Sequence, residues 1–313
     1  MLKVLRSLVF VSFVAITPVH LPVYAQDSSA KAPIDDAKAQ ALKNAESESQ
    51  AALLAANAAM RPGPVDIKFT DQAVIKVPKG FVFVPVTESA RLLRSMGNSP
   101  RDDLLGMVFP ANDVSGNWFI VARFEKSGYI KDDDAKDWNA DELLANLKEG
   151  TEAGNKERLE RGIPAMEVVG WVELPHYNAT TQRMIWSAST RDKGAPTDAQ
   201  KGINYNTYAL GREGYISMNL VTNLNEVEVQ KPIARQLLGA LTFNDGKRYA
   251  DFNSSTDKMA EYGLAALIGG IAAKKLGLLA VGAAFLAKFA KIIALAALGA
   301  GAGFAKFFKR DRS

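Results

Sequence analysis

The C-terminal stretch of residues 262–310 constrains this chain more than any other feature, because its composition suits a lipid bilayer. It contains no acidic residue and no proline, and it is dense in Ala, Gly, Leu and Ile. Lysines punctuate it at Lys274, Lys275, Lys288, Lys291 and Lys306. Apolar helices of about 20 residues are the signature of membrane spans. The sequence therefore predicts a membrane-associated helical tail, over residues 259–313.

The lysines decide where a span can lie. A lysine near the bilayer centre costs about 2.5–3.5 kcal/mol on insertion scales, which disfavours spans centred on Lys274 or Lys288. A span over residues 289–308 puts Lys291 and Lys306 near its ends, where both ammonium groups can reach the headgroups. We therefore predict one span there, flanked by these two lysines.

Basic residues follow this predicted span directly. Lys309 and Arg310 stand just beyond it, and the positive-inside rule assigns such residues to the cytoplasm. Residues 262–287 form either an amphipathic helix along the membrane surface or a second short span. We favour the surface helix, because a two-span hairpin would return the basic C-terminus to the exported side.

Residues 1–25 have the layout of a secretory signal peptide. Lys3 and Arg6 precede an apolar run over residues 8–16, and short residues lead to a cleavage site after Ala25. An uncleaved N-terminal anchor is the alternative, but the apolar run is too short to span a bilayer comfortably. We predict export.

The basic charge of the chain belongs to its two ends. Of 38 basic and 34 acidic residues, ten basic and two acidic ones lie in residues 1–25 and 259–313. Residues 26–258 are left with 28 basic and 32 acidic residues, a net charge of −4. A nucleic-acid partner therefore loses its main electrostatic support.

Several kinds of chemistry are excluded by composition. The chain has no cysteine and only two histidines, His20 and His176, which rules out disulfides, thiolate catalysis and multi-histidine metal sites. Residues 137–141 repeat the start of a calcium loop, but Glu142 and Lys148 stand where that loop needs a glycine and a bidentate acid. We predict no metal site and no cofactor.

A change of composition marks the start of the main domain. Residues 26–63 are rich in Ala, Ser, Glu, Lys and Gln and offer little to bury, which predicts a mobile linker that is partly helical or disordered. Pro62 and Pro64 stop any helix there. We therefore expect an exported domain over residues 64–258.

This domain is predicted to be of the α+β class. Residues 65–69 alternate apolar and polar side chains, as a half-buried strand does. The same pattern predicts strands at 73–77, 81–86, 104–109, 118–125, 166–174, 183–190, 204–210, 215–221 and 241–243. Helices are expected with Thr87 as a cap, with Asn139 as a cap, and with Pro232 in the first turn. Strict βαβ alternation is missing, so we predict a mainly antiparallel sheet with a few inserted helices, followed by the C-terminal helical membrane segment.

The most unusual cluster of side chains is aromatic. Trp171, His176 and Tyr177 lie on one predicted strand and Trp186 on the next, so a hairpin would bring the two tryptophans close together. Aromatic rings beside an imidazole can form a ligand or partner site. The alternative is ordinary packing next to a turn, which we favour.

Arg212 completes the candidate partner surface. It lies in the sequence Gly211-Arg212-Glu213-Gly214, which predicts a hairpin turn with the arginine exposed. No nucleophile-elbow pattern accompanies His176, so a hydrolase lacks its nucleophile.

Several motifs in a fixed order resemble a bacterial family of membrane-anchored proteins known as domain of unknown function 2167. They are Gly170-Trp171 through Pro175-His176-Tyr177, Leu210-Gly211-Arg212, Tyr249-Ala250-Asp251-Phe252-Asn253, Thr256-Asp257-Lys258 and Tyr262-Gly263-Leu264-Ala265-Ala266. The resemblance extends from about residue 65 to the C-terminus. It implies an exported domain with a C-terminal membrane anchor in Gram-negative bacteria, and it transfers no activity, cofactor or catalytic residue.

These observations lead to one main hypothesis and two alternatives. The main one is an interaction or sensing module at the inner membrane, with its domain in the periplasm and its C-terminus in the cytoplasm. Its expected partners are the lipid bilayer and other membrane or periplasmic proteins. The alternatives are a membrane-bound hydrolase or transferase using His176, and a structural subunit that assembles, also with itself, through its C-terminal helices.

Overall fold

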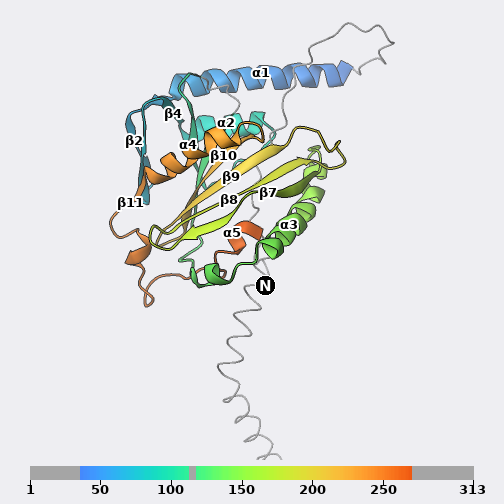
Figure 1. Cartoon of the computed structure of the whole chain (residues 1–313). Coiled ribbons are helices and arrows are strands. Elements are labelled where there is room, and N and C mark those ends of the chain that lie inside the picture. Colours follow the sequence, from blue (N-terminus) through green and yellow to red (C-terminus); the bar gives the residue numbers. More distant parts are fainter. Residues whose placement is uncertain (1–35, 113–117, 270–313) are drawn as a thin grey trace, which may run out of the picture.

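Two antiparallel sheets form the centre of the molecule. The computed structural model describes residues 36–112 and 118–269. An eight-stranded sheet has the order β1-β4-β5-β6-β10-β9-β8-β7, and a three-stranded sheet has the order β11-β3-β2 (Figure 1). All neighbouring strands within both sheets are antiparallel. The predicted class, a mainly antiparallel sheet with a few helices, is confirmed.

The strands follow the predicted segments closely. They are β1 Arg61–Pro62, β2 Val65–Phe69, β3 Ala73–Val77, β4 Phe81–Val84, β5 Leu104–Pro110, β6 Phe119–Glu125, β7 Met166–Asn178, β8 Arg183–Asp192, β9 Gly202–Leu210, β10 Tyr215–Asn223 and β11 Leu241–Phe243. The helices are α1 Asp36–Ala59, α2 Val86–Ser95, α3 Ala140–Glu160, α4 Val227–Gly239 and α5 Ala266–Gly269, with short 3-10 helices η1 Asp133–Asp137 and η2 Tyr249–Asp251.

One face of the large sheet packs against the small sheet and helix α4. Its core includes Ile120 on β6, Tyr205 on β9 and Met218 on β10, together with Ile75 on β3 and Leu237 on α4. These five side chains are at most 1% exposed. This layer covers the middle of the sheet on the α4 side, whereas the end near β7 and β8 is only partly buried there.

The opposite face is covered by two separate groups of helices. Helices α1 and α2 pack over β4 and β5, whereas α3 and α5 lie near β7 and β8 at the other end (Figure 1). The middle strands β6, β10 and β9 lie between the two groups. They contribute buried side chains to both helix-covered cores, Phe119, Val121 and Val221 to one and Tyr208, Leu210 and Tyr215 to the other.

The segment predicted as a mobile linker is corrected in its second half. Helix α1 is continuous to Ala59, and both Ala52 and Ala56 are fully buried in the core that it shares with α2. Arg61 and Pro62 then form β1, which pairs with β4. Two alanines suffice for this packing because small side chains allow the two helices to approach closely. The prediction of a linker rested on the scarcity of large apolar residues and did not consider such packing.

The predicted helix ends were right in one case and wrong in two. The Asn139 side chain accepts hydrogen bonds from the backbone N–H groups of Asp141 and Glu142, which confirms this cap. Helix α2 instead begins after Pro85, without a side-chain cap from Thr87. Pro232 lies inside α4, because the helix begins one turn earlier than predicted, at Val227.

The predicted terminal segments lie outside the described residues. These are the signal peptide over residues 1–25 and the span over residues 289–308 with its basic flank. Among the helices that the structure describes, none combines the length and the apolarity required to cross a bilayer.

Candidate functional site

The two predicted tryptophans do meet, Trp186 in the core and Trp171 partly buried against it. Strands β7 and β8 form the expected hairpin, and the ring centroids of Trp171 and Trp186 lie 6.0 Å apart with the planes at 82°. Trp186 is fully buried, and the indole N–H of Trp171 donates to the carbonyl oxygen of Ala140 at 3.1 Å. The packing alternative therefore describes this pair.

The sheet separates Tyr177 from His176. Tyr177 packs with the tryptophans and donates its hydroxyl to Asp132 at 2.8 Å, and burial raises the pKa of this tyrosine. His176 is exposed and pairs with Ile185, which belongs to the core on the α4 side. Because neighbouring residues of a strand point to opposite faces, these two side chains cannot serve one site.

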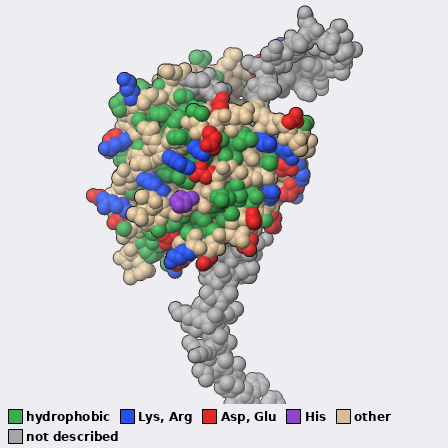
Figure 2. Space-filling view, in the orientation of Figure 1, with side chains coloured by type: hydrophobic (Ala, Val, Ile, Leu, Met, Phe, Trp, Pro, Cys, Tyr) green, Lys and Arg blue, Asp and Glu red, His purple; other side chains and the backbone are tan. Residues whose placement is uncertain are grey.

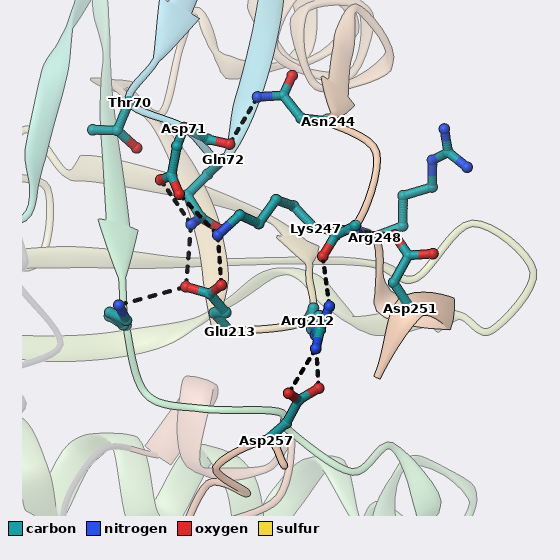
Figure 3. A network of polar contacts seen from close by, with 12 residues as sticks. Thr70, Asp71, Gln72, Arg212, Glu213, Asn244, Lys247, Arg248, Asp251 and Asp257 are labelled. Atoms are coloured by element: carbon teal, nitrogen blue, oxygen red, sulfur yellow. Dashed lines mark hydrogen bonds and ion pairs between the residues drawn. The ribbon is translucent and has the colours of Figure 1, made fainter. Parts of the chain in front are cut away.

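Arg212 was predicted to be exposed, but its side chain is only 28% exposed and is held in an ion pair. It does lie in the β9–β10 hairpin turn, but its Nε and Nη2 atoms contact the two carboxylate oxygens of Asp257 at 2.7 and 2.8 Å (Figure 3). Its Nη1 atom donates to the carbonyl oxygen of Gly246 at 3.1 Å. Such bidentate pairs are the geometrically most specific ion pairs in proteins.

A second ion cluster lies beside this pair. The Lys247 ammonium contacts Glu213 Oε1 at 2.5 Å and Asp71 Oδ2 at 2.8 Å, and Gln72 donates to Glu213 Oε2 at 3.3 Å (Figure 3). Hydrogen bonding to Lys247 lowers the pKa of Asp71 to about 2 and also lowers that of Glu213. We call these five charged residues the clasp: Arg212, Asp257, Lys247, Glu213 and Asp71.

The clasp holds the segment that leads toward the C-terminal tail. This segment, residues 245–269, is called the arm below. Tyr129 stacks between two of its rings, at 4.4 Å from Tyr249 and 3.9 Å from Phe252, measured between centroids. The backbone of Tyr129 also pairs with the arm, accepting from the N–H of Ala260 at 2.8 Å and donating to the carbonyl of Lys258 at 2.9 Å.

Asp134 fixes the end of the arm. Its two carboxylate oxygens accept the backbone N–H groups of Leu264 and Ala265 at 3.1 and 2.9 Å. A Cβ atom at Gly263 would lie 2.6 Å from Asp134 Oδ2, so only glycine leaves room for this contact. Leu264 itself is fully buried in the core beneath α3.

A second polar cluster, which sequence analysis missed, crosses the middle of the large sheet. Ser217 on β10 lies opposite Arg123 on β6, and Asn219 on β10 lies opposite Asn206 on β9. Asn204 precedes Asn206 by two residues and therefore lies on the same face of β9. We call these five residues the polar band. They lie between the two helix-covered cores and are only 2–8% exposed.

Several atoms in and beside the polar band have no hydrogen-bond partner among residues 36–112 and 118–269. They are Arg123 Nε and Nη1, Asn204 Oδ1, Asn219 Oδ1 and Asp103 Oδ1. Arg123 Nε lies 3.6 Å from Asp103 Oδ1, close enough for attraction but too far for a hydrogen bond. Burial lowers the pKa of the Arg123 guanidinium.

The sequence did contain a pattern that marks two residues of the polar band, but this pattern predicted a strand with one face in water. Ser217 and Asn219 alternate with Ile216, Met218 and Leu220, a pattern typical of a strand with one face in water. In the structure both faces of β10 are buried.

Comparison with models of protein families identifies the family of this chain. Residues 61–299 match the family described as "Protein of unknown function (DUF2167)". The chain belongs to this DUF2167 family. The match covers the whole described domain from β1 onward, and no curated protein matches the chain.

The solved structures that resemble this DUF2167 protein are distant. Cyanobacterial PsbP (CyanoP) from Synechocystis sp. PCC 6803 shares 10% identity over 60% of this chain and 94% of its own, with a TM-score of 0.35. The Ran-binding protein Mog1p of Saccharomyces cerevisiae shares 12% identity over 62% of this chain and 100% of its own, with a TM-score of 0.31. Likenesses of this size carry no argument about function.

The motifs that resemble DUF2167 now have structural roles in the arm. Tyr249 and Phe252 stack on Tyr129, and the carboxylate of Asp257 is held by Arg212. Gly263 makes room for the carboxylate that caps the arm. These motif residues therefore hold the arm to the domain. Among the described residues no group of three or more His, Asp or Glu side chains could hold a metal ion.

Proposed function

We propose that this DUF2167 protein is an exported binding or sensing module, tethered to the inner membrane of a Gram-negative bacterium by its C-terminal tail. The predicted signal peptide, the net negative charge of residues 26–258 and the basic C-terminal tail support the proposal. On the face shown in Figure 2, acidic and basic side chains interleave.

The observation that carries this proposal is the tight attachment of the arm. A tether that only kept the domain near a surface would need no contacts with it. Here an aromatic stack, a bidentate ion pair and a carboxylate cap hold residues 245–269 against the domain. Because the arm runs directly into the tail, these contacts give the tail a defined point of departure. The domain would then face the bilayer in one orientation and present the same surface to a partner.

The expected partners follow from this orientation. The lipid bilayer is the first, with Lys291, Lys306, Lys309 and Arg310 at the ends of the proposed span. Other membrane or periplasmic proteins would contact the domain surface whose orientation the arm fixes. A second copy of the chain would bind through the tail.

The contacts of β7 do not favour the hydrolase hypothesis. His176 has no hydrogen bond or ion pair within the described part of the chain. Both carboxylates of its strand are engaged elsewhere, Glu167 with Arg191 at 2.5 Å and Glu173 with Arg235 at 2.6 Å. A histidine acting as a general base needs an oriented partner of this kind.

Site-specific thiol labelling tests the topology, because the chain has no cysteine of its own. Lys79→Cys introduces a thiol at an exposed turn of the domain. We expect a membrane-impermeant maleimide to label it in intact spheroplasts. The matched variant Ser313→Cys should react only after permeabilisation. Protection of the thiol at position 79, or labelling at position 313 in intact spheroplasts, would overturn the proposed orientation.

A further inference from the structure

We propose that the end of the domain formed by η1 and the arm lies on the bilayer and contacts the phospholipid headgroups. The inference rests on the proposed membrane tether and names the surface of the domain that meets the membrane. Six partly exposed aromatic side chains and one exposed methionine mark this surface. We call these seven residues the aromatic rim: Tyr129, Trp138, Tyr177, Tyr249, Phe252, Met259 and Tyr262.

The point at which the described chain ends is the first argument. Leu264, Leu267 and Ile268 are at most 4% exposed, so residues 262–269, which sequence analysis assigned to the tail, belong to the domain. The predicted membrane-associated segment can therefore begin only after Gly269. Both alternatives for this segment, a helix along the membrane surface and a second short span, start at the headgroups. Either way, the bilayer surface begins within a few residues of the end of the arm.

The aromatic rim lies at this end of the domain. Figure 1 shows η1 and the arm together at the end opposite to helix α1. Four members of the rim border the core that contains Leu264, namely Trp138, Tyr177, Tyr249 and Tyr262. Tyr129 is connected to them through its ring stack with Tyr249 and Phe252. The backbone of Tyr129 also forms a β-bridge with Met259, so the rim is one continuous group.

The chemistry of these side chains suits the headgroup region. Tyrosine and tryptophan concentrate at membrane–water interfaces because each combines an apolar ring with one polar group. The hydroxyl groups of Tyr177 and Tyr249 are hydrogen-bonded within the domain, each at 2.8 Å, to Asp132 and to the carbonyl oxygen of Ile130. Their partly exposed rings therefore offer apolar surface without a free hydroxyl. Met259 is 41% exposed and adds a flexible apolar side chain.

The charges near the aromatic rim argue against anionic lipid as the source of attraction. Residues 131–137 and 258–269 contain three lysines and five acidic residues. Two of these acids are engaged, Asp132 by Tyr177 and Asp134 by backbone N–H groups of the arm. The net charge of this end is thus negative, and an anionic membrane surface would repel it. Contact with zwitterionic headgroups through the apolar surface of the rim fits this composition.

Spin labels on single cysteines test the contact, because the chain has no cysteine of its own. The full chain is incorporated into phosphatidylcholine nanodiscs, and the accessibility of each label to oxygen and to a water-soluble nickel chelate is measured. The label at Met259→Cys should give a severalfold higher ratio of oxygen to nickel accessibility than the label at Leu54→Cys. Leu54 is 71% exposed on α1, at the opposite end of the domain, and is the matched control. Equal ratios at the two positions would overturn the proposal.

A second label makes the test independent of a cysteine at position 259. Lys136→Cys places the label on η1 at an exposed position and should also give the higher ratio. In this background Met259→Asp should lower the ratio toward the aqueous value, whereas Leu54→Asp should leave it unchanged. An unchanged ratio in the Met259→Asp variant would exclude the rim as the contact. A ratio that rises when phosphatidylglycerol is added would contradict the proposal, because it would assign the attraction to charge.

The same preparation judges the proposed tether separately. A chain that does not co-purify with nanodiscs would refute the tether and, with it, the contact. A chain that co-purifies but gives equal ratios at positions 54 and 259 would leave the tether in place and refute the contact alone.

Discussion

The clasp and the polar band are both polar clusters supported by the large sheet, and they differ in how well their charges are paired. In the clasp, Arg212, Lys247 and their three carboxylate partners all have an opposite charge within hydrogen-bond distance. In the polar band, Arg123 has one carboxylate at 3.6 Å and two donor atoms without a hydrogen bond among the described residues.

Exposure makes this contrast informative. The side chain of Arg212 is 28% exposed, so water could complete its hydrogen bonds if its partners were missing. The side chain of Arg123 is 9% exposed and has no such relief. The clasp is partly exposed to water and yet has an internal partner for every charge. The polar band is buried and yet lacks partners for several atoms. We conclude that the clasp serves the position of the arm, whereas the polar band leaves buried polar atoms of the described chain without partners.

The largest effect is expected where the arm enters the core. Leu264→Ala removes a fully buried side chain, and a leucine-to-alanine change in a core costs about 2–5 kcal/mol. Denaturant unfolding of the full chain in micelles measures the loss. Met259→Ala, at an arm residue that is 41% exposed, is the control. Equal and small losses in both variants would show that the arm is not docked as described.

A change of opposite sign is expected in the polar band. Asn219→Leu removes a buried acceptor that has no partner among the described residues, so the free energy of unfolding should rise by about 1 kcal/mol. The same denaturant experiment measures it. A clear loss of stability would mean that the amide already has partners, which would make the polar band resemble the clasp.

Acid should weaken the clasp selectively. The folded-state pKa of Asp71 is about 2, below its ordinary value of 3.8, and that of Glu213 is also lowered from 4.5, chiefly through hydrogen bonds with Lys247. A lowered folded-state pKa contributes stability above the unfolded-state value, and this contribution is lost as the pH falls. The wild type should therefore lose stability from about pH 4.5 toward pH 2.

Lys247→Met removes the cause of these shifts and tests that explanation. Its melting temperature should depend less on pH than that of the wild type over the same range. Lys258→Met, at an exposed lysine of the arm, should keep the wild-type dependence. Parallel pH profiles for the Lys247→Met variant and the wild type would contradict the assignment.

The smallest effect is expected at His176. Its side chain is exposed, so His176→Gln should change the free energy of unfolding by less than about 0.5 kcal/mol, as measured by the same denaturant experiment. A loss of more than about 1 kcal/mol would show that the imidazole takes part in the fold.

Particular residues show how far sequence reasoning reached. The contact of Trp171 with Trp186 was predictable, because a hairpin brings neighbouring strands together across a short turn. The ion pair of Arg212 was not, since its partner Asp257 is 45 residues away and belongs to a loop without periodicity. Helix α1 shows a third case, in which a composition with little to bury still packs through Ala52 and Ala56.

The sequence by itself determined the order and type of most elements of the domain, because period-two alternation, caps and turn residues act over a few neighbouring positions. It also identified the family motifs and the apolar tail. Only the tertiary structure decided which of the polar residues are buried. Asn219 has the local pattern of a residue in water, and its burial depends on a sheet whose other strands come from distant parts of the chain. Burial is a sum over non-local contacts, and no local periodicity reports it.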